Sequence, residues 1–146
     1  MRGLVQRVAW AEVEVEGRVV GRIENGLLVY VGVAAGDTPQ QARWLAEKIA
    51  HLRVFKDDQD KLNRSVRDAG GNVLAVSNFT LLADARKGRR PAFSAAAGHE
   101  QAGPIHEAFL EALRAQGLRV ETGVFGARMA IRSQADGPVN VVIDTP

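Results

Sequence analysis

The residues best suited to chemistry stand together in the segment Ser77-Asn78-Phe79-Thr80. The apolar run Val73 to Val76 comes before them, after the turn signal Gly70-Gly71-Asn72, and is typical of a buried strand. A cationic segment, residues 86–90, follows. Polar groups at the end of a buried strand, close to positive charge, form a place that can hold a phosphate-bearing ligand. An ordinary strand leaving the core has the same pattern, so both interpretations stay open here.

Thr80 is the candidate nucleophile of this segment. A threonine hydroxyl can attack an ester, but it needs an adjacent base, and no histidine, lysine or N-terminal amine stands next to Thr80 in the sequence. In a second role, the backbone N–H groups of Phe79 and Thr80 stabilise charge that develops on a carbonyl oxygen. Ser77 and Asn78 then hold the neighbouring sugar or amino group. The sequence does not decide between these two roles.

The length and composition predict one globular domain over residues 1–146, and the order of strand and helix patterns along the chain predicts the α+β class. The 46% hydrophobic and 25% charged content is ordinary for a globular domain. The chain has no cysteine, which excludes disulfides and thiolate chemistry. The spacing of His51, His99 and His106 is not that of a zinc site, so we expect no metal and no cofactor.

Charge and hydropathy limit the partners. The net charge of +2 allows contact with the end of an RNA, but it is small for a protein that neutralises many phosphates along a groove. No apolar run approaches the ~20 residues that span a bilayer, and the chain starts without a signal-peptide pattern. We therefore expect no membrane partner and a cytoplasmic location.

Hydrophobic periodicity predicts the elements that position the segment 77–80, with more strands than helices. His106 is expected in the second helix, outside any active site. The predicted elements are a hairpin over 3–23 that turns at Glu16-Gly17, a strand at 27–33, a helix at about 39–52 capped by Thr38, a strand at 73–82, a helix at about 101–116, and strands at 118–124, 127–132 and 139–143.

A second cluster stands near the C-terminus: Ala135-Asp136-Gly137-Pro138-Val139-Asn140, preceded by Gly123-Val124-Phe125-Gly126-Ala127-Arg128-Met129. With Val5-Gln6-Arg7-Val8 and the segment at 77–81, it makes the chain resemble the D-aminoacyl-tRNA deacylase family, whose two motifs are roughly Ser-Gln-Phe-Thr-Leu and Asn-Asp-Gly-Pro-Val-Thr. Further matches run in order along the whole chain: Gly26-Leu27-Leu28-Val29, Arg53-Val54-Phe55 and Arg89-Arg90-Pro91-Ala92-Phe93-Ser94.

Three residues depart from the family's pattern. Asn78 stands where the family has Gln, which keeps the amide and shortens the reach by one methylene. Ala135 replaces Asn and Asn140 replaces Thr. These departures leave open which hydrogen bonds the three side chains make.

The resemblance implies a fold and an activity. The fold is a curved, barrel-like, mainly antiparallel sheet with two outer helices, in a homodimer. The activity is hydrolysis of the ester bond of D-aminoacyl-tRNA, and of glycyl-tRNA, at the 3′ end. The neighbouring ribose hydroxyl assists the reaction, and L-aminoacyl substrates are rejected.

The resemblance also assigns roles to residues. It implies that Thr80 and Phe79 are catalytic, and that Ser77, Asn78, Met129, Gly137 and Pro138 bind the substrate. Met129 and the turn 125–127 are implied to surround the terminal adenine. The Gly137–Pro138 bond is implied to be cis and to enter the partner subunit's site, where its carbonyls exclude an L side chain.

Two other functions remain possible on the sequence. One is a module that binds an RNA end without chemistry, since the basic loop and the aromatic residues Phe79 and Phe93 serve both uses equally. The other is a small-molecule hydrolase with Thr80 as its nucleophile. Arg7 and the cationic loop at 86–90 are candidates either for phosphate contact or for structural ion pairing.

Overall fold

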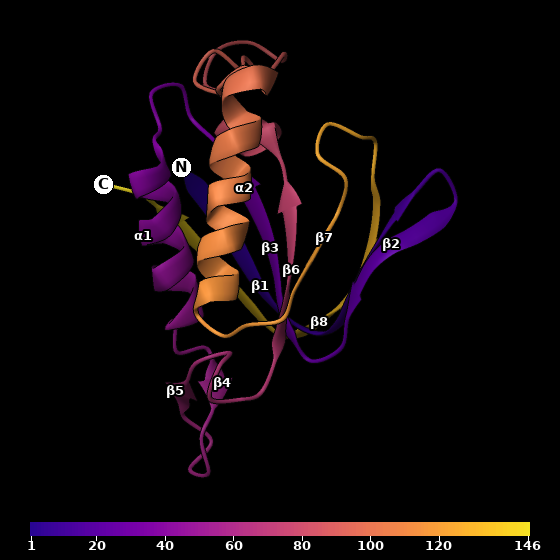
Figure 1. The fold of residues 1–146 in the computed structure, drawn as a ribbon, viewed down its shortest axis with the longest axis vertical. Helices are drawn as coiled ribbons and strands as arrows, with labels where there is room; N and C mark the ends of the chain where they lie inside the picture. The colour runs from indigo at the N-terminus through magenta and orange to yellow at the C-terminus, as the bar shows by residue number, and fades with distance from the viewer.

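A sheet of six strands forms the body of the protein, and two helices lie side by side over one of its faces (Figure 1). The computed structural model describes residues 1–146. No helix is both long and apolar enough to cross a lipid bilayer. The strands of the large sheet are β1 (Arg2–Val15), β2 (Arg18–Ile23), β3 (Gly26–Gly32), β6 (Asn72–Ser77), β7 (Val120–Thr122) and β8 (Ala130–Asp144). A small separate hairpin consists of β4 (Phe55–Lys56) and β5 (Leu62–Arg64).

Strand β1 organises the sheet. Its first half pairs antiparallel with β3 and its second half with β2, while β8 pairs antiparallel with both halves. Beyond β3 the sheet continues through the parallel pairs β3–β6 and β6–β7. Strand β2 comes back into contact with β6 and β7, so the sheet is nearly closed. The expected curved, barrel-like and mainly antiparallel sheet with two outer helices is confirmed.

The core has two parts, one on each face of the central strands. Successive side chains of a strand point to opposite faces, so the apolar runs of β3 and β6 supply both parts. One part lies between sheet and helices and includes Leu27, Val29, Val31, Val73 and Ala75; the other lies inside the barrel and includes Leu28, Leu74 and Val76. The run at 27–33 is thus covered on both faces, as predicted.

Helix α1 (Pro39–Ala50) begins as its capping signal predicts. The Thr38 side chain accepts a hydrogen bond from the Gln40 N–H, and the Gln41 side chain returns to the backbone of Thr38, which completes a capping box. Helix α2 (His99–Ala115) starts two residues before the predicted one and contains Gly103 and Pro104. The hairpin turn also lies where predicted, with Glu16 and Gly17 at positive φ.

Two predicted strand boundaries are wrong. The strand predicted at 73–82 ends at Ser77, and the 3₁₀ helix η1 (Phe79–Leu82) follows. The Asn78 side chain accepts a hydrogen bond from the Thr80 N–H at 3.1 Å, and such a local bond turns the chain out of an extended conformation. The strand predicted at 118–124 is shortened to β7.

The strand predicted at 139–143 and residues 130–132 of the strand predicted at 127–132 belong to one strand, β8, because β1 is long enough to pair with both segments; residues 127–129 lie before it. The pairing register jumps between Gln6 with Asn140 and Val8 with Ala135. Residues 136–139 therefore form a bulge opposite Arg7. The Gly-Pro pair lies in this bulge, not in a turn between two strands.

His106 lies in α2, as predicted, and is buried, with 5% of its surface exposed. Its ring packs against those of Phe109 and Phe125, and its Nδ1 has no hydrogen-bond partner. Burial disfavours the charged imidazolium and lowers the pKa of His106 to about 4.

We expect this histidine to make the fold sensitive to acid. Between a pH of about 4 and the ordinary histidine pKa of about 6.5, the unfolded chain holds a proton on this ring that the folded chain does not, so stability falls as the pH falls. Relative to His106→Phe, the wild type should lose about 2 kcal/mol of unfolding free energy between pH 7 and pH 5. Urea denaturation at both pH values measures this, and parallel losses in the two proteins would contradict it.

Candidate active site

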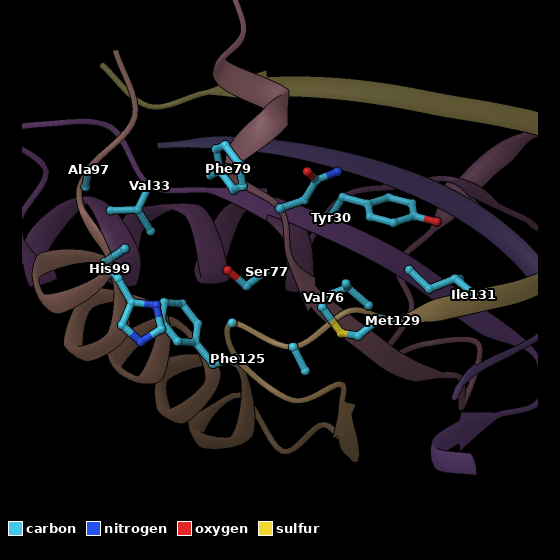
Figure 2. A pocket seen from close by; sticks show the side chains of 14 residues that line it. Tyr30, Val33, Val76, Ser77, Phe79, Ala97, His99, Phe125, Met129 and Ile131 are labelled. Atoms are coloured by element: carbon cyan, nitrogen blue, oxygen red, sulfur yellow. The ribbon is translucent and has the colours of Figure 1, made fainter. Parts of the chain in front are cut away.

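A cavity of about 590 Å³ lies where β3 and β6 end and η1 begins. The start of α2 and the segment before β8 complete its walls, so the cavity is built from four separate parts of the chain (Figure 2). Ten of its 14 lining residues are hydrophobic. A mostly apolar cavity with a few polar groups is the usual form of a small-ligand site.

The polar side chains of the cavity come from Ser77, Asn78, Tyr30 and His99. Figure 2 shows Ser77 between the ring of Phe79 on one side and those of His99 and Phe125 on the other. Burial raises the pKa of the Tyr30 phenol, which therefore stays neutral over the physiological range. The cavity has no carboxylate, lysine or arginine side chain on its walls.

Asn78 fixes the conformation of the segment 77–80. Its side-chain oxygen accepts hydrogen bonds from both the backbone N–H and the hydroxyl of Thr80. Asn78, which stands where the family has Gln, therefore caps η1 through its side-chain amide. The Thr80 hydroxyl is turned towards this amide, not towards a base.

The two predicted catalytic residues are both exposed, but they lie differently. Phe79 lines the cavity, and its ring packs edge-on against Phe93 with centroids 5.1 Å apart. Thr80 does not line the cavity. The Thr80 N–H already donates to Asn78, whereas no group of the protein accepts the N–H of Phe79.

The opposite wall is formed by Met129 and the turn 125–127. A Cβ at Gly103 of α2 would lie 3.5 Å from the Phe125 ring, an ordinary van der Waals distance, so the ring packs directly on this helix. The ring lies beside those of His99 and His106, which stand about two turns apart on the same helix. The helix thus holds the wall in place.

The Gly137–Pro138 bond is cis, as the resemblance implied. The buried Arg7 side chain holds the bulge of β8 in place. Its guanidinium donates hydrogen bonds to the Val54 carbonyl at 2.6 Å and to the Asp136 carbonyl at 3.1 Å, and it forms an ion pair with the Asp136 carboxylate. Arg7 is therefore a structural ion-pairing residue. Gly137 and Pro138 do not line the cavity of their own chain.

The cationic loop is connected to the cavity through the contact between Phe93 and Phe79. Within this loop, Arg86 pairs with Asp84 and lowers the pKa of the Asp84 carboxyl. Of the two roles considered for the loop, Arg86 therefore has the structural one, ion pairing. Lys87, Arg89 and Arg90 are exposed and form no ion pair.

The structure thus brings together Ser77, Asn78, Phe79 and Met129 of the predicted site and leaves Thr80, Gly137 and Pro138 outside the cavity. Sequence reasoning did not find His99 and Tyr30. Each looks like an ordinary helix or strand residue, and only the fold brings them to one cavity.

The family model described as D-Tyr-tRNA(Tyr) deacylase matches residues 4–144. The chain belongs to this family. A D-aminoacyl-tRNA deacylase of Koribacter versatilis (strain Ellin345) is 54% identical over 145 residues, which cover 99% of this chain and 97% of the relative. A D-aminoacyl-tRNA deacylase of Thermus aquaticus is also 54% identical, over 99% of this chain and 95% of its own.

Two solved structures share the fold of this chain. A protein named c-Myc DNA Unwinding Element Binding Protein superposes with a TM-score of 0.93 at 38% identity, covering 100% of this chain and 99% of its own. A structure described as a probable eukaryotic D-amino acid tRNA deacylase shares the fold, with a TM-score of 0.84 at 19% identity over 97% of each chain.

Proposed function

We propose that this deacylase-family protein hydrolyses the ester bond that joins a D-amino acid, or glycine, to the 3′-terminal ribose of a tRNA. The products are the free amino acid and the tRNA. The observation that carries the proposal is the convergence of Ser77, Asn78, Phe79 and Met129 on one cavity in a chain that matches the family over nearly its whole length.

The substrate fits the cavity in three parts. The apolar wall of Phe125, Ala127 and Met129 suits the flat face of the terminal adenine. Ser77 lies in the middle, where the ribose joins the ester. The ester carbonyl then lies at the start of η1, next to the N–H of Phe79.

The catalytic role of this segment is electrostatic. An attacking water puts negative charge on the carbonyl oxygen, and a fixed N–H donor in an apolar site stabilises that charge in the transition state. The Phe79 N–H is the donor without an acceptor in the protein. Thr80 contributes through its bonds to Asn78, which hold η1 in shape.

The tRNA supplies the group that the walls lack. No cavity side chain forms an acid–base pair with Thr80, and the ribose hydroxyl next to the ester can orient the water or assist the leaving oxygen. Catalysis is thus assisted by the RNA.

Handedness is selected by a second copy of the chain. Strand β8 is 15 residues long and pairs only with β1, so its other edge is open, and Val142 on it is 60% exposed. Such a long open edge is a ready site for association. In the homodimer that we propose, the Gly137–Pro138 bulge of one subunit enters the cavity of the other.

The carbonyls of this bulge then face the α-carbon of the amino acid and leave no space for an L side chain. A D side chain points to solvent, so many D-amino acids are accepted, and glycine also enters. The exposed Lys87, Arg89 and Arg90 contact phosphates close to the tRNA end. The cytoplasm, where charged tRNA is found, is the proposed location.

Turnover of matched D- and L-tyrosyl-tRNA tests the proposal. We expect kcat/KM for the D ester to exceed that for the L ester by at least about a hundredfold. Removing the ribose hydroxyl next to the ester should lower kcat for the D substrate by about a hundredfold or more, since it acts as a general acid–base group. A protein that binds the charged tRNA and protects both esters is an RNA-end binder, and this result would reject the proposed activity.

The role of Thr80 is tested by Thr80→Ala with Thr80→Ser as its matched control. In the electrostatic mechanism Thr80→Ala keeps kcat within about tenfold of the wild type, because it loses only one local hydrogen bond. Loss of a covalent nucleophile lowers kcat by about 10⁴-fold or more. A loss of that size, restored by serine and accompanied by a covalent adduct in the wild type, would establish Thr80 as the nucleophile instead.

The Gly-Pro wall is tested by Gly137→Ala. Gly137 has φ +134°, and an added Cβ would lie 2.7 Å from the Val139 nitrogen, so alanine shifts this backbone. We expect the preference for D over L esters to fall by about tenfold or more. Gly17→Ala is the control, because Gly17 also has positive φ but no atom near its Cβ position. Unchanged stereoselectivity in a folded Gly137→Ala protein would count against the wall.

A further inference from the structure

His99 is a polar group on the wall opposite Ser77. It is the first residue of α2 and is exposed, and its ring lines the cavity beside the ring of Phe125 (Figure 2). The neighbouring wall residues are all apolar. The imidazole is therefore the one hydrogen-bonding side chain on this part of the wall.

The ring is held in place by packing. Its centroid lies 4.9 Å from that of Phe125, with the planes inclined by 47°. Its Cε1 lies against Gly126, so closely that a Cβ there would be 2.7 Å away. Gly126 also has a φ of +77°, which favours glycine. The backbone thus leaves space for the ring and limits its rotation.

The nitrogens of this ring are not used within the protein. His51 offers a contrast, since its Nδ1 lies 2.9 Å from the Glu47 carbonyl and its Nε2 lies 3.1 Å from Arg67. No side-chain or backbone group of the protein forms a hydrogen bond with the ring nitrogens of His99, unlike those of His51. A fixed imidazole on a cavity wall therefore presents one donor and one acceptor to a ligand.

We propose that His99 is a specificity-determining residue that hydrogen-bonds the edge of the terminal base of the substrate. The inference rests on the proposed function and deepens it. Apolar and aromatic walls stack on any base, so they do not distinguish one base from another. Adenine carries ring-nitrogen acceptors and an amino donor on its edge, and the imidazole can pair with either kind of group.

His99→Phe is the decisive variant, because phenylalanine keeps an aromatic ring against Phe125 and removes both nitrogens. Its thermal melting and near-UV dichroism report whether the fold is kept. With D-tyrosyl-tRNA we expect KM to rise about three- to tenfold, the worth of one hydrogen bond, while kcat stays within about twofold. A fall in kcat with KM unchanged would overturn the proposed contact.

Three forms of the tRNA identify the base atom that His99 contacts. They end in adenosine, in 7-deazaadenosine, which lacks the N7 acceptor, or in purine riboside, which lacks the amino group. The wild type should lose about threefold or more in kcat/KM with at least one analogue, and His99→Phe should treat all three alike. Equal discrimination by the two proteins would overturn the inference.

A binding experiment separates this inference from the proposed activity. Adenosine, 7-deazaadenosine and purine riboside are titrated into each protein and followed by nuclear magnetic resonance. If the wild type binds the three nucleosides with different affinities and His99→Phe binds them alike, the base contact is supported. If no ester is hydrolysed in that case, only the proposed activity fails. Affinities that are the same for the three nucleosides in the wild type would overturn the base contact, whatever the turnover.

Discussion

The hydrogen bonding of β1 along both of its edges is the constraint on which the rest of the structure depends. One edge carries β3 and β2 in succession, and the other carries β8. This arrangement fixes β3 next to β6, whose end starts the cavity, and it sets the bulge of β8 against Arg7. The two motifs that lie some 60 residues apart in the sequence are therefore held in one rigid sheet, although they do not meet within one chain.

The chemistry of the cavity follows from what its walls lack. In the proposed mechanism, a neutral, mostly apolar cavity with the free N–H of Phe79 depends on a substrate that brings its own hydroxyl. In the proposed dimer, the backbone atoms of Gly137 and Pro138 discriminate between D- and L-amino acids. A side-chain substitution elsewhere in the cavity does not replace these backbone atoms.

The sequence was enough to predict the fold class, both helices and the central strands, because their apolar patterns are regular and their caps are ordinary. It was also enough to place Ser77, Asn78, Phe79 and Met129 together in one candidate site, and these four residues line one cavity. It did not predict that Asn78 would end β6, because the same polar residues also suit the end of a longer strand. The continuous β8 was missed for a related reason: its bulge contains the glycine and proline that usually mark a turn. His99 and Tyr30 reach the cavity only through tertiary packing, which leaves no local trace in the sequence.

The composition of the wall has a consequence for damage by oxidants. The chain has no cysteine and only two methionines, and Met129 is the one that lines the cavity. Conversion of its thioether to a sulfoxide would add a polar oxygen to the surface proposed for the base. Peroxide stress would thus reach this cavity through a single sulfur atom, in a form that methionine sulfoxide reductases can repair.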